Sequence, residues 1–198
     1  MFFGQDINFA TRDAKIKVDL HKMTEGRQDA TIMVAYLAQK ERTDEALLAA
    51  TAKADQLLNE IERMVAMNCT AVDIAYTPAD LYRLKREGKK AIMLGIENGY
   101  AIGKDLTNVE RFRNRGVVYM TLCHNGNNDI CGSARYNDGH IGVTPFGEQV
   151  IREMNRTGMM VDLSHAGEQT FYDTLDISSK PVVCSHSSSR ALCDHPRN

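Results

Sequence analysis

The stretch that decides the fold is GMMVDLSHAGEQTFYDTLDISSKPVVCSHS, residues 158–187. An apolar run ends in Ser164-His165, a stretch with helical spacing follows, and a second apolar run ends in Ser185-His186. A strand, a helix and a strand of this length make a parallel crossover, so both histidines emerge at one edge of a sheet. Because loops at this edge carry the chemistry of α/β folds, the two imidazoles predict a metal site.

Composition bounds the class of protein. The 198 residues, 43% hydrophobic and 25% charged, fit a single soluble globular domain. The net charge is -2, with Lys and Arg mixed among Asp and Glu, so we expect no nucleic-acid partner. The N-terminus MFFGQDINFATRD has no basic n-region, and no apolar stretch reaches the ~20 residues of a membrane span. We therefore expect a cytoplasmic protein without a membrane segment.

The cysteines are odd in number and form no C-x-x-C pair, so we expect reduced core residues in a reducing compartment. Two of them, Cys123 and Cys184, lie close to predicted strand-end histidines and are minor candidates for metal ligands. The full set is Cys69, Cys123, Cys131, Cys184 and Cys193.

Apolar runs and capping residues predict alternating strands and helices along the chain. Strands are predicted at 30–38, 70–76, 89–98 and 116–124. A first helix is predicted after Thr43, with an apolar Leu/Met stripe that runs from Leu47 and Leu48 to Val65. Further helices are predicted from Thr77-Pro78 to Gly88, around 105–115, and from Thr144-Pro145 to Gly158. Residues 1–29 look irregular, and 125–143, rich in Asn and Gly, read as a long loop that is functional or disordered.

Four consecutive predicted strands end in Glu97, His124, His165 and His186. Successive βα units with polar residues at each strand end are typical of a (β/α)8 barrel, an α/β fold. Neighbouring strands lie about 4.8 Å apart, so such side chains can converge on one ion cluster. One carboxylate with two or three imidazoles suits zinc. The alternative is that Glu97 forms a local ion pair and His124 is an ordinary loop residue.

Four long stretches carry a family resemblance. They are GIENG at 95–99, GVVYMTLCHNGNND at 116–129, TPFGEQVIREMNRTGMMVDLSH at 144–165 and KPVVCSHSSSRALCDHPRN at 180–198. In these stretches the chain resembles the membrane (renal-type) dipeptidases, binuclear zinc metallopeptidases built on a (β/α)8 barrel. Residues 30–93 fit the same layout more weakly.

The resemblance implies a role for each candidate. Glu97 would bridge two zinc ions, and His165 and His186 would both ligate one of them. His124 would face the substrate and stabilise the tetrahedral intermediate, and Arg197 would hold the terminal carboxylate of a dipeptide as a bidentate fork. The implied reaction is attack of a metal-bridging hydroxide on the dipeptide amide, without a covalent nucleophile.

The serines beside these histidines are therefore expected to support ligands or form turns. They are Ser164, Ser185 and Ser187.

The chain also departs from the family pattern. The family opens with a strand whose H-x-D pair ligates the first zinc, whereas His21 is followed by Lys22 and Met23. The family also takes an aspartate from its last barrel strand, which the sequence up to Asn198 does not supply. We count about five barrel strands, and a complete barrel typically has roughly 250 residues. We therefore expect a single partial-barrel metallopeptidase domain over 1–198, lacking the first strand and the last strands.

An incomplete barrel has consequences and alternatives. Open strand edges seek partners, so we expect a homo-oligomer. Two zinc ions belong to a complete site; here one or none is expected, with weak or absent dipeptidase activity. The alternatives are another barrel metallohydrolase of the deaminase or lactonase type, and an inactive metal-binding fragment that folds only as an oligomer. Arg197 discriminates, because a carboxylate clamp suits peptide substrates.

Overall fold

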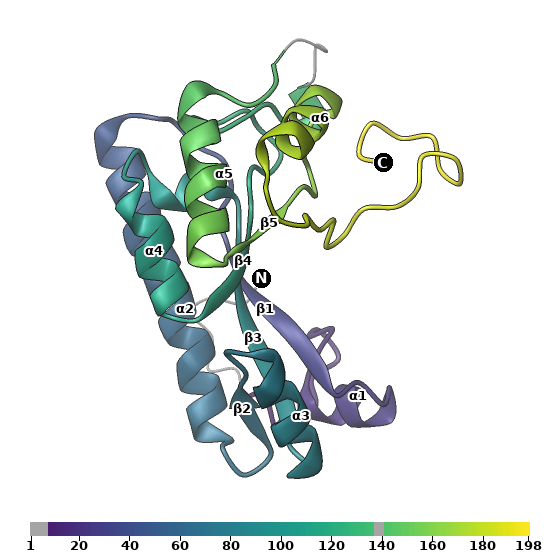
Figure 1. The fold of residues 1–198 in the computed structure, drawn as a ribbon. Helices are drawn as coiled ribbons and strands as arrows, with labels where there is room; N and C mark the ends of the chain where they lie inside the picture. Colours follow the sequence, from purple (N-terminus) through teal and green to yellow (C-terminus); the bar gives the residue numbers. More distant parts are fainter. Residues whose placement is uncertain (1–7, 137–140) are drawn as a thin grey trace. The chain divides into compact units, whose positions relative to one another are not determined.

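The computed structural model describes residues 8–136 and 141–198 and shows an α/β fold with a parallel sheet (Figure 1). The strands are β1 (Ala30–Tyr36), β2 (Val72–Ile74), β3 (Lys90–Glu97), β4 (Val117–Thr121) and β5 (Met160–Asp162). The helices are α1 (Leu20–Glu25), α2 (Asp44–Met67), α3 (Pro78–Arg86), α4 (Thr107–Asn114), α5 (Pro145–Thr157) and α6 (Glu168–Ile177), with short 3-10 turns at Gly99–Ile102 and Ala134–Tyr136. The strand order is β1-β3-β4-β5, and β2 also pairs with β3. The pairs β2·β3 and β4·β5 are parallel.

The chain forms two compact units. The first comprises the described part of Met1–Val34 together with Gln56–Leu94, and the second comprises Ala35–Asp55 together with Gly95–Asn198. We call them the N-terminal unit and the site unit, because every candidate site residue belongs to the second. The single domain expected over the whole chain stays a prediction.

In the N-terminal unit, α3 begins and ends where the sequence predicts. The side chain of Thr77 accepts from the backbone N–H of Asp80, whose carboxylate accepts from the backbone N–H of Thr77, and Pro78 opens the first turn. Gly88 follows the helix with φ of 74°, a left-handed conformation that glycine adopts without strain. The fully buried Leu84 of α3 packs in a small core with Ala75 and Ala91.

Residues 1–29 were expected to be irregular, and this is wrong for α1. The described part contains this six-residue helix because Asp19, fully buried, caps its start: Asp19 Oδ1 accepts from the Lys22 backbone N–H at 2.8 Å. Lys22 Nζ also lies 3.0 Å from Asp19 Oδ2. Residues 1–7, on which part of the expectation about the N-terminus rests, lie outside the described residues.

The predicted apolar stripe of α2 is largely confirmed. Ala54 and Leu58 are fully buried, and Leu47 and Val65 at the two ends of the stripe are also buried. Leu48 is the exception, with 74% of its surface exposed. A helix buries a stripe rather than a full circumference, so two adjacent leucines need not both face inward.

In the site unit, α4 packs on β4 and α5, and α5 packs on β5 and α6 (Figure 1). The contact is apolar: Val109 and Phe112 of α4 and Val150 and Met154 of α5 are fully buried. These two helices therefore cover one face of the strands that carry the candidate site.

The loop predicted at 125–143 is tightly bound to the end of β4 in its described part. Buried Asn128 donates to the Leu122 carbonyl at 2.8 Å and accepts from the backbone N–H groups of Ile130 and Cys131. The carbonyl of Gly132 accepts from the Thr170 hydroxyl at 2.8 Å. Residues 137–140 of this loop lie outside the described residues.

The second strand predicted within 158–187, which was expected to end in Ser185-His186, is wrong as an extended element. It contributes an isolated parallel bridge between Asp162 and Val183, in which Val183 donates to the Val161 carbonyl and accepts from the Leu163 N–H. The ladder stops after this bridge because the backbone N–H of Ser185 donates to the Asp162 carboxylate and not to a backbone carbonyl. Residues 183–187 nevertheless run alongside the end of β5.

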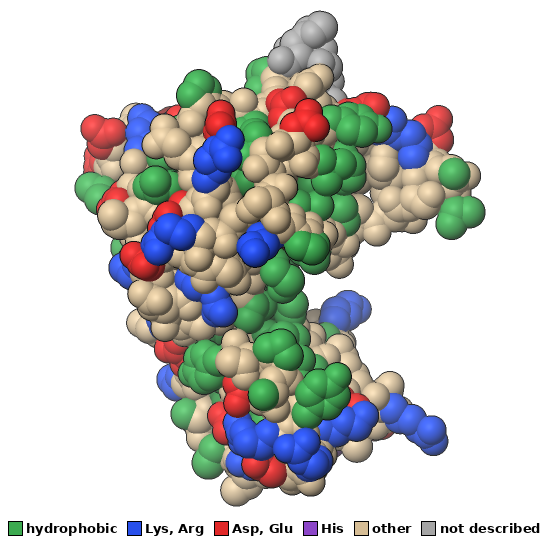
Figure 2. Space-filling model, viewed as in Figure 1, with side chains coloured by type: hydrophobic (Ala, Val, Ile, Leu, Met, Phe, Trp, Pro, Cys, Tyr) green, Lys and Arg blue, Asp and Glu red, His purple; other side chains and the backbone are tan. Residues whose placement is uncertain are grey.

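The surface and the cysteines are consistent with parts of the sequence analysis. On the face drawn in Figure 2, Lys and Arg side chains are interspersed with Asp and Glu. Every helix within residues 8–136 and 141–198 is too short or too polar to cross a bilayer.

All five cysteines are free thiols, but only Cys123 and Cys131 are buried, so the core role expected of the other three is wrong.

Candidate metal centre

Each candidate ligand belongs to the site unit and lies at the carboxyl end of an extended segment. Glu97 is the last residue of β3, and His124 and His165 follow the ends of β4 and β5 by three residues. His186 follows the bridge residue Val183 by the same number. Parallel neighbours bring their carboxyl ends to one edge, which is the placement predicted from the sequence.

The backbone around Glu97 is fixed by neighbouring segments. Its carbonyl accepts from the N–H of Leu37, just after β1, at 3.1 Å. The next residue, buried Asn98, has φ of 92° and donates from Nδ2 to the Leu37 carbonyl at 3.0 Å. Asparagine tolerates the left-handed region better than most residues, so the chain can turn directly after the carboxylate.

Glu97, His165 and His186 form a compact group whose potential ligand atoms all lie within 4.8 Å of one another. Glu97 Oε1 is 3.2 Å from His165 Nε2 and 3.3 Å from His186 Nε2, and the two Nε2 atoms are 2.8 Å apart. Tetrahedral zinc with bonds of about 2.0–2.1 Å needs ligand atoms about 3.3 Å apart. The two oxygen–nitrogen distances fit this requirement, and the two nitrogens would separate by about half an ångström. The donor set therefore fits zinc.

Glu97 is an acceptor in this group. Burial alone would raise its pKa, but the hydrogen bond from His165 and the charges of His186, His165 and His124 lower the pKa below the usual value. For His186, burial is the largest effect and lowers the pKa, against the opposing influence of Glu97. An ionised carboxylate beside a neutral imidazole is the protonation state that metal binding requires.

His124 lies beside the group. Its Nε2 is 3.8 Å from Glu97 Oε1, and its ring centre is 4.2 Å from that of His165. Burial, followed by the charge of His165, lowers the pKa of His124 to about 4, so the imidazole is neutral near pH 7. Tyr36, the last residue of β1, places its hydroxyl 3.4 Å from His124 Nδ1. Tyr36 was not a sequence candidate, although its position at a predicted strand end was an available signal.

His165 is oriented by a residue from the loop after β4. Its Nδ1 lies 3.0 Å from Asn125 Oδ1. An amide oxygen only accepts, so Nδ1 carries a proton. Nε2 points toward Glu97 and His186, donates to Glu97 in the metal-free protein, and would give up that proton to bind zinc. His165 itself has φ of 71°, and its carbonyl accepts from the Ala134 N–H at 2.8 Å.

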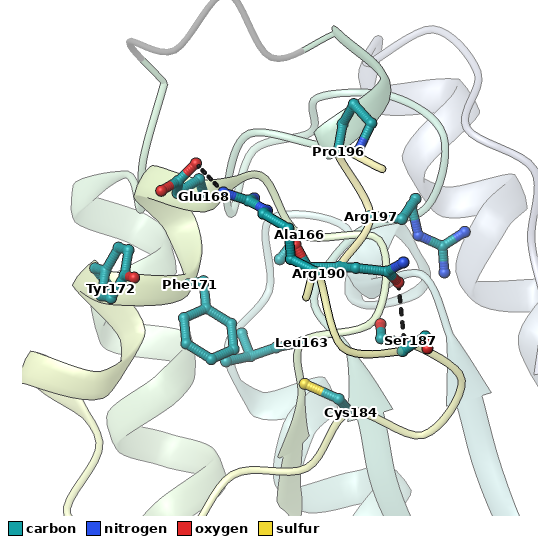
Figure 3. Close-up of a pocket in the computed structure, with 12 residues that line it drawn as sticks. Leu163, Ala166, Glu168, Phe171, Tyr172, Cys184, Ser187, Arg190, Pro196 and Arg197 are labelled. Atoms are coloured by element: carbon teal, nitrogen blue, oxygen red, sulfur yellow. Dashed lines mark hydrogen bonds and ion pairs between the residues drawn. The ribbon is translucent and has the colours of Figure 1, made fainter. Parts of the chain in front are cut away.

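Arg197 lies on the C-terminal segment of the site unit. Its Nη2 donates to the His186 carbonyl at 3.3 Å, and its buried Nε has no hydrogen-bond partner. It lines a cavity of about 400 Å³ whose apolar wall includes Leu163 and Phe171 (Figure 3). Across this cavity Arg190 pairs with Glu168 at 3.1 Å (Figure 3).

The two cysteines considered as minor ligands are not in the compact group. Cys123 is buried and its thiol donates to the carbonyls of Gly132 and His165. Cys184 is exposed and lines the cavity beside Arg197. Both thiols are therefore accounted for without a metal.

A parallel α/β sheet with a carboxylate and imidazoles at its carboxyl edge is an arrangement typical of metal-dependent barrel proteins. The model of one family, Membrane dipeptidase (Peptidase family M19), matches residues 1–198. The chain belongs to this family, as the resemblance predicted.

Individual relatives agree with this assignment. The chain is 34% identical over 193 residues to Dipeptidase tcpJ of Claviceps purpurea, covering 95% of this chain and 45% of that protein. It is 31% identical over 199 residues to Dipeptidase 3 of Mus musculus, covering 98% and 38%. The structure of the probable dipeptidase PvdM from Pseudomonas aeruginosa matches with a TM-score of 0.86 and 29% identity, over 96% of this chain and 50% of that chain. The chain thus spans about half the length of the relatives it matches, or less, and its fold is that of part of such a barrel.

Proposed function

We propose that this protein is a zinc-dependent dipeptidase that hydrolyses the amide bond of dipeptides. The observation that carries the proposal is the meeting of Glu97, His165 and His186 at one sheet edge, with both oxygen–nitrogen distances close to those of tetrahedral zinc. Membership of the dipeptidase family supports the substrate class.

Each residue has a distinct part in the proposed reaction. Glu97, His165 and His186 would hold zinc, which when bound supplies a Lewis acid for the scissile carbonyl and lowers the pKa of water. Neutral His124, beside this group, would donate a hydrogen bond to the developing oxyanion. Arg197 would hold the terminal carboxylate of the dipeptide through a charge-assisted hydrogen bond.

We propose one zinc ion per chain. Among the described residues the compact group offers three ligands, which is enough for one open tetrahedral site with a position left for water or substrate. Elemental analysis of the purified, zinc-saturated chain should give one ion per polypeptide. Two tightly bound ions would contradict this stoichiometry.

The function is tested by turnover. The zinc-saturated chain and a metal-free sample are assayed against a panel of dipeptides, the corresponding dipeptide amides, a lactone and a nucleoside. We expect weak, zinc-dependent hydrolysis of dipeptides and a rate on dipeptide amides about 10-fold or more lower, because the amides lack the carboxylate that Arg197 would bind.

Matched variants complete this test. Glu97→Gln should lose both zinc and turnover, whereas Glu60→Gln, at an exposed surface position, should keep both. Hydrolysis of the lactone or the nucleoside without dipeptide hydrolysis would replace this proposal by the other barrel metallohydrolase. Zinc binding without any turnover would replace it by a metal-binding fragment.

We also propose a homo-oligomer, because open sheet edges are covered by pairing with another chain. Light scattering at working concentration should report a mass above that of one chain, and a sharp monomer peak would refute the proposal. The cytoplasmic location expected from the sequence stays a prediction.

A further inference from the structure

A chain of hydrogen bonds runs from a buried carboxylate to His186. Asp162, the last residue of β5, is fully buried, and its Oδ2 accepts from the Ser185 hydroxyl at 2.7 Å and from the Thr121 hydroxyl at 2.6 Å. Ser185 Oγ lies 2.8 Å from His186 Nδ1. The carboxylate thus reaches an exposed imidazole through a single hydroxyl.

The remaining contacts of Asp162 show that it acts as an acceptor. Its Oδ1 receives the backbone N–H groups of Ser164 at 3.1 Å and Ser185 at 2.9 Å, and both groups can only donate. Four donors around one carboxylate favour the ionised form. Burial would raise the pKa of Asp162, but these hydrogen bonds lower it below the usual value.

The direction of the hydrogen bonds follows from the number of protons available. A serine hydroxyl has one hydrogen, and Ser185 gives it to Asp162. Ser185 Oγ then accepts from His186, so the proton of the neutral imidazole lies on Nδ1. The lone pair of His186 Nε2 is left to face Glu97 Oε1 at 3.3 Å and His165 at 2.8 Å.

A second serine fixes the backbone of the same residue. Buried Ser164 accepts from the His186 backbone N–H at 2.9 Å, and its hydroxyl lies 3.3 Å from Ser185 Oγ. The backbone of His186 is therefore held by Ser164, just after β5, and its imidazole by Ser185, whose hydroxyl is held by Asp162 of β5.

We infer that Asp162 and Ser185 are positioning residues that hold His186 in the tautomer whose Nε2 can bind zinc. This inference rests on the proposed function, in which His186 is a ligand. Partners of this kind behind a histidine ligand typically change metal affinity 10- to 100-fold.

Three substitutions separate positioning from mere structural support. Ser185→Ala removes the hydroxyl but keeps the backbone N–H bond to Asp162, and Ser185→Thr restores a hydroxyl. Asp162→Asn offers an amide N–H to Ser185 Oγ, which turns the serine hydrogen toward His186 and favours the tautomer protonated on Nε2. Thr121→Val is the matched control, because it removes a bond to the same carboxylate oxygen without touching the path to His186.

The experiment combines NMR with zinc titration. Long-range ¹H–¹⁵N spectra of the metal-free protein report the His186 tautomer, a chromophoric chelator in competition reports zinc affinity, and thermal unfolding reports stability. We expect the Nδ1–H tautomer in the natural chain and in Ser185→Thr, and its partial or complete loss in Ser185→Ala and Asp162→Asn. Zinc affinity should fall about 10-fold or more in the latter two. Thr121→Val should unfold at a lower temperature with tautomer and affinity unchanged.

Two results would overturn the inference. One is an unchanged His186 tautomer in Ser185→Ala. This variant decides the question by itself if Asp162→Asn does not fold. The other is a loss of zinc affinity in Thr121→Val as large as in Ser185→Ala, since that indicates general support only. If the natural chain binds no zinc, the proposed function fails, whereas the tautomer measured in metal-free protein still decides whether Asp162 and Ser185 position His186.

Discussion

His165 and His186 face the same carboxylate, yet the segments that carry them are held differently. The His165 side chain is 5% exposed and lies under the loop after β4, with Asn125 behind its Nδ1. The His186 side chain is 43% exposed and lies beyond a single β-bridge, with Ser185 and buried Asp162 behind its Nδ1. One imidazole is fixed mainly by burial and a neutral amide, and the other by hydrogen bonds that lead to a carboxylate.

The two imidazoles thus reach the same carboxylate although one is held mainly by burial and the other mainly by hydrogen bonds. Burial excludes water from the Asn125–His165 pair, so a neutral acceptor is sufficient there. An exposed imidazole competes with water for its partner, and a hydroxyl polarised by a carboxylate is a stronger acceptor. We therefore expect loss of the His165 imidazole to lower the free energy of unfolding more than loss of the His186 imidazole, which should mainly lower zinc affinity.

The largest effect is expected from removing the imidazoles themselves. His165→Asn and His186→Asn should each lower zinc affinity on the order of 100-fold or more, because each removes one of three ligands. Asparagine tolerates the positive φ of residue 165, so backbone strain is not added. His165→Asn should also lower the free energy of unfolding by about 1–3 kcal/mol, and His186→Asn by less than about 1 kcal/mol.

Zinc competition and urea unfolding of the metal-free variants measure both quantities. A larger loss of stability in His186→Asn than in His165→Asn would contradict the contrast between the two segments.

The next largest effect concerns the neutral partner of His165. Asn125→Ala removes the acceptor from Nδ1 and should lower zinc affinity about 10-fold. Asn125→Asp keeps an acceptor at the same place and should retain more of the affinity than the alanine variant. Chelator competition checks both variants, and equal losses in the two would show that the Nδ1 hydrogen bond has no part in zinc binding.

A smaller effect is expected from pH on the metal-free protein. Burial lowers the pKa of His124 to about 4 in the folded chain, against about 6.5 for an exposed histidine. Between these values the unfolded chain binds more protons than the folded one, so stability falls as the pH is lowered from about 6.5 to 4. His124→Gln should flatten this dependence in urea unfolding with EDTA present. The control His21→Gln, at an exposed residue, should leave the pH dependence of stability unchanged. An unchanged dependence in His124→Gln would contradict the lowered pKa of His124.

The smallest effect is expected at the surface of the segment that carries His186. Arg190 pairs with Glu168 at 3.1 Å, and both side chains are about half exposed (Figure 3). Such pairs contribute about 0–1 kcal/mol, so Arg190→Ala should change stability by no more than this and zinc affinity by less than about twofold. Calorimetric titration with zinc checks the affinity. A 10-fold loss would show that the contacts of Arg190 with Glu168 and with the Asn198 carbonyl, and not Asp162, hold the segment.

Elements bounded by local signals could be predicted from the sequence. The helices after Thr77-Pro78 and Thr144-Pro145 start at a capping side chain and end at glycines 88 and 158, and the structure confirms both. The strand expected to end in Ser185-His186 was wrong because a distant carboxylate, Asp162, takes the backbone N–H of Ser185 that would have continued the ladder. Hydrophobic pattern alone does not contain that information.

From the amino-acid sequence alone came the family, the alternation of strands and helices, and three candidate metal ligands at strand ends: Glu97, His165 and His186. The helices and strands follow from the hydrophobic period and from capping residues, which are local signals. The placement of the candidate ligands at one edge follows from the parallel pairing of the strands. Only the tertiary structure decided which atoms stand behind each imidazole, because Asn125 with His165 and Asp162 with Ser185 are far apart in the chain and meet only through packing. A hydrogen bond between distant residues has no periodic signature, so its partners appear only when the sheet edge is assembled.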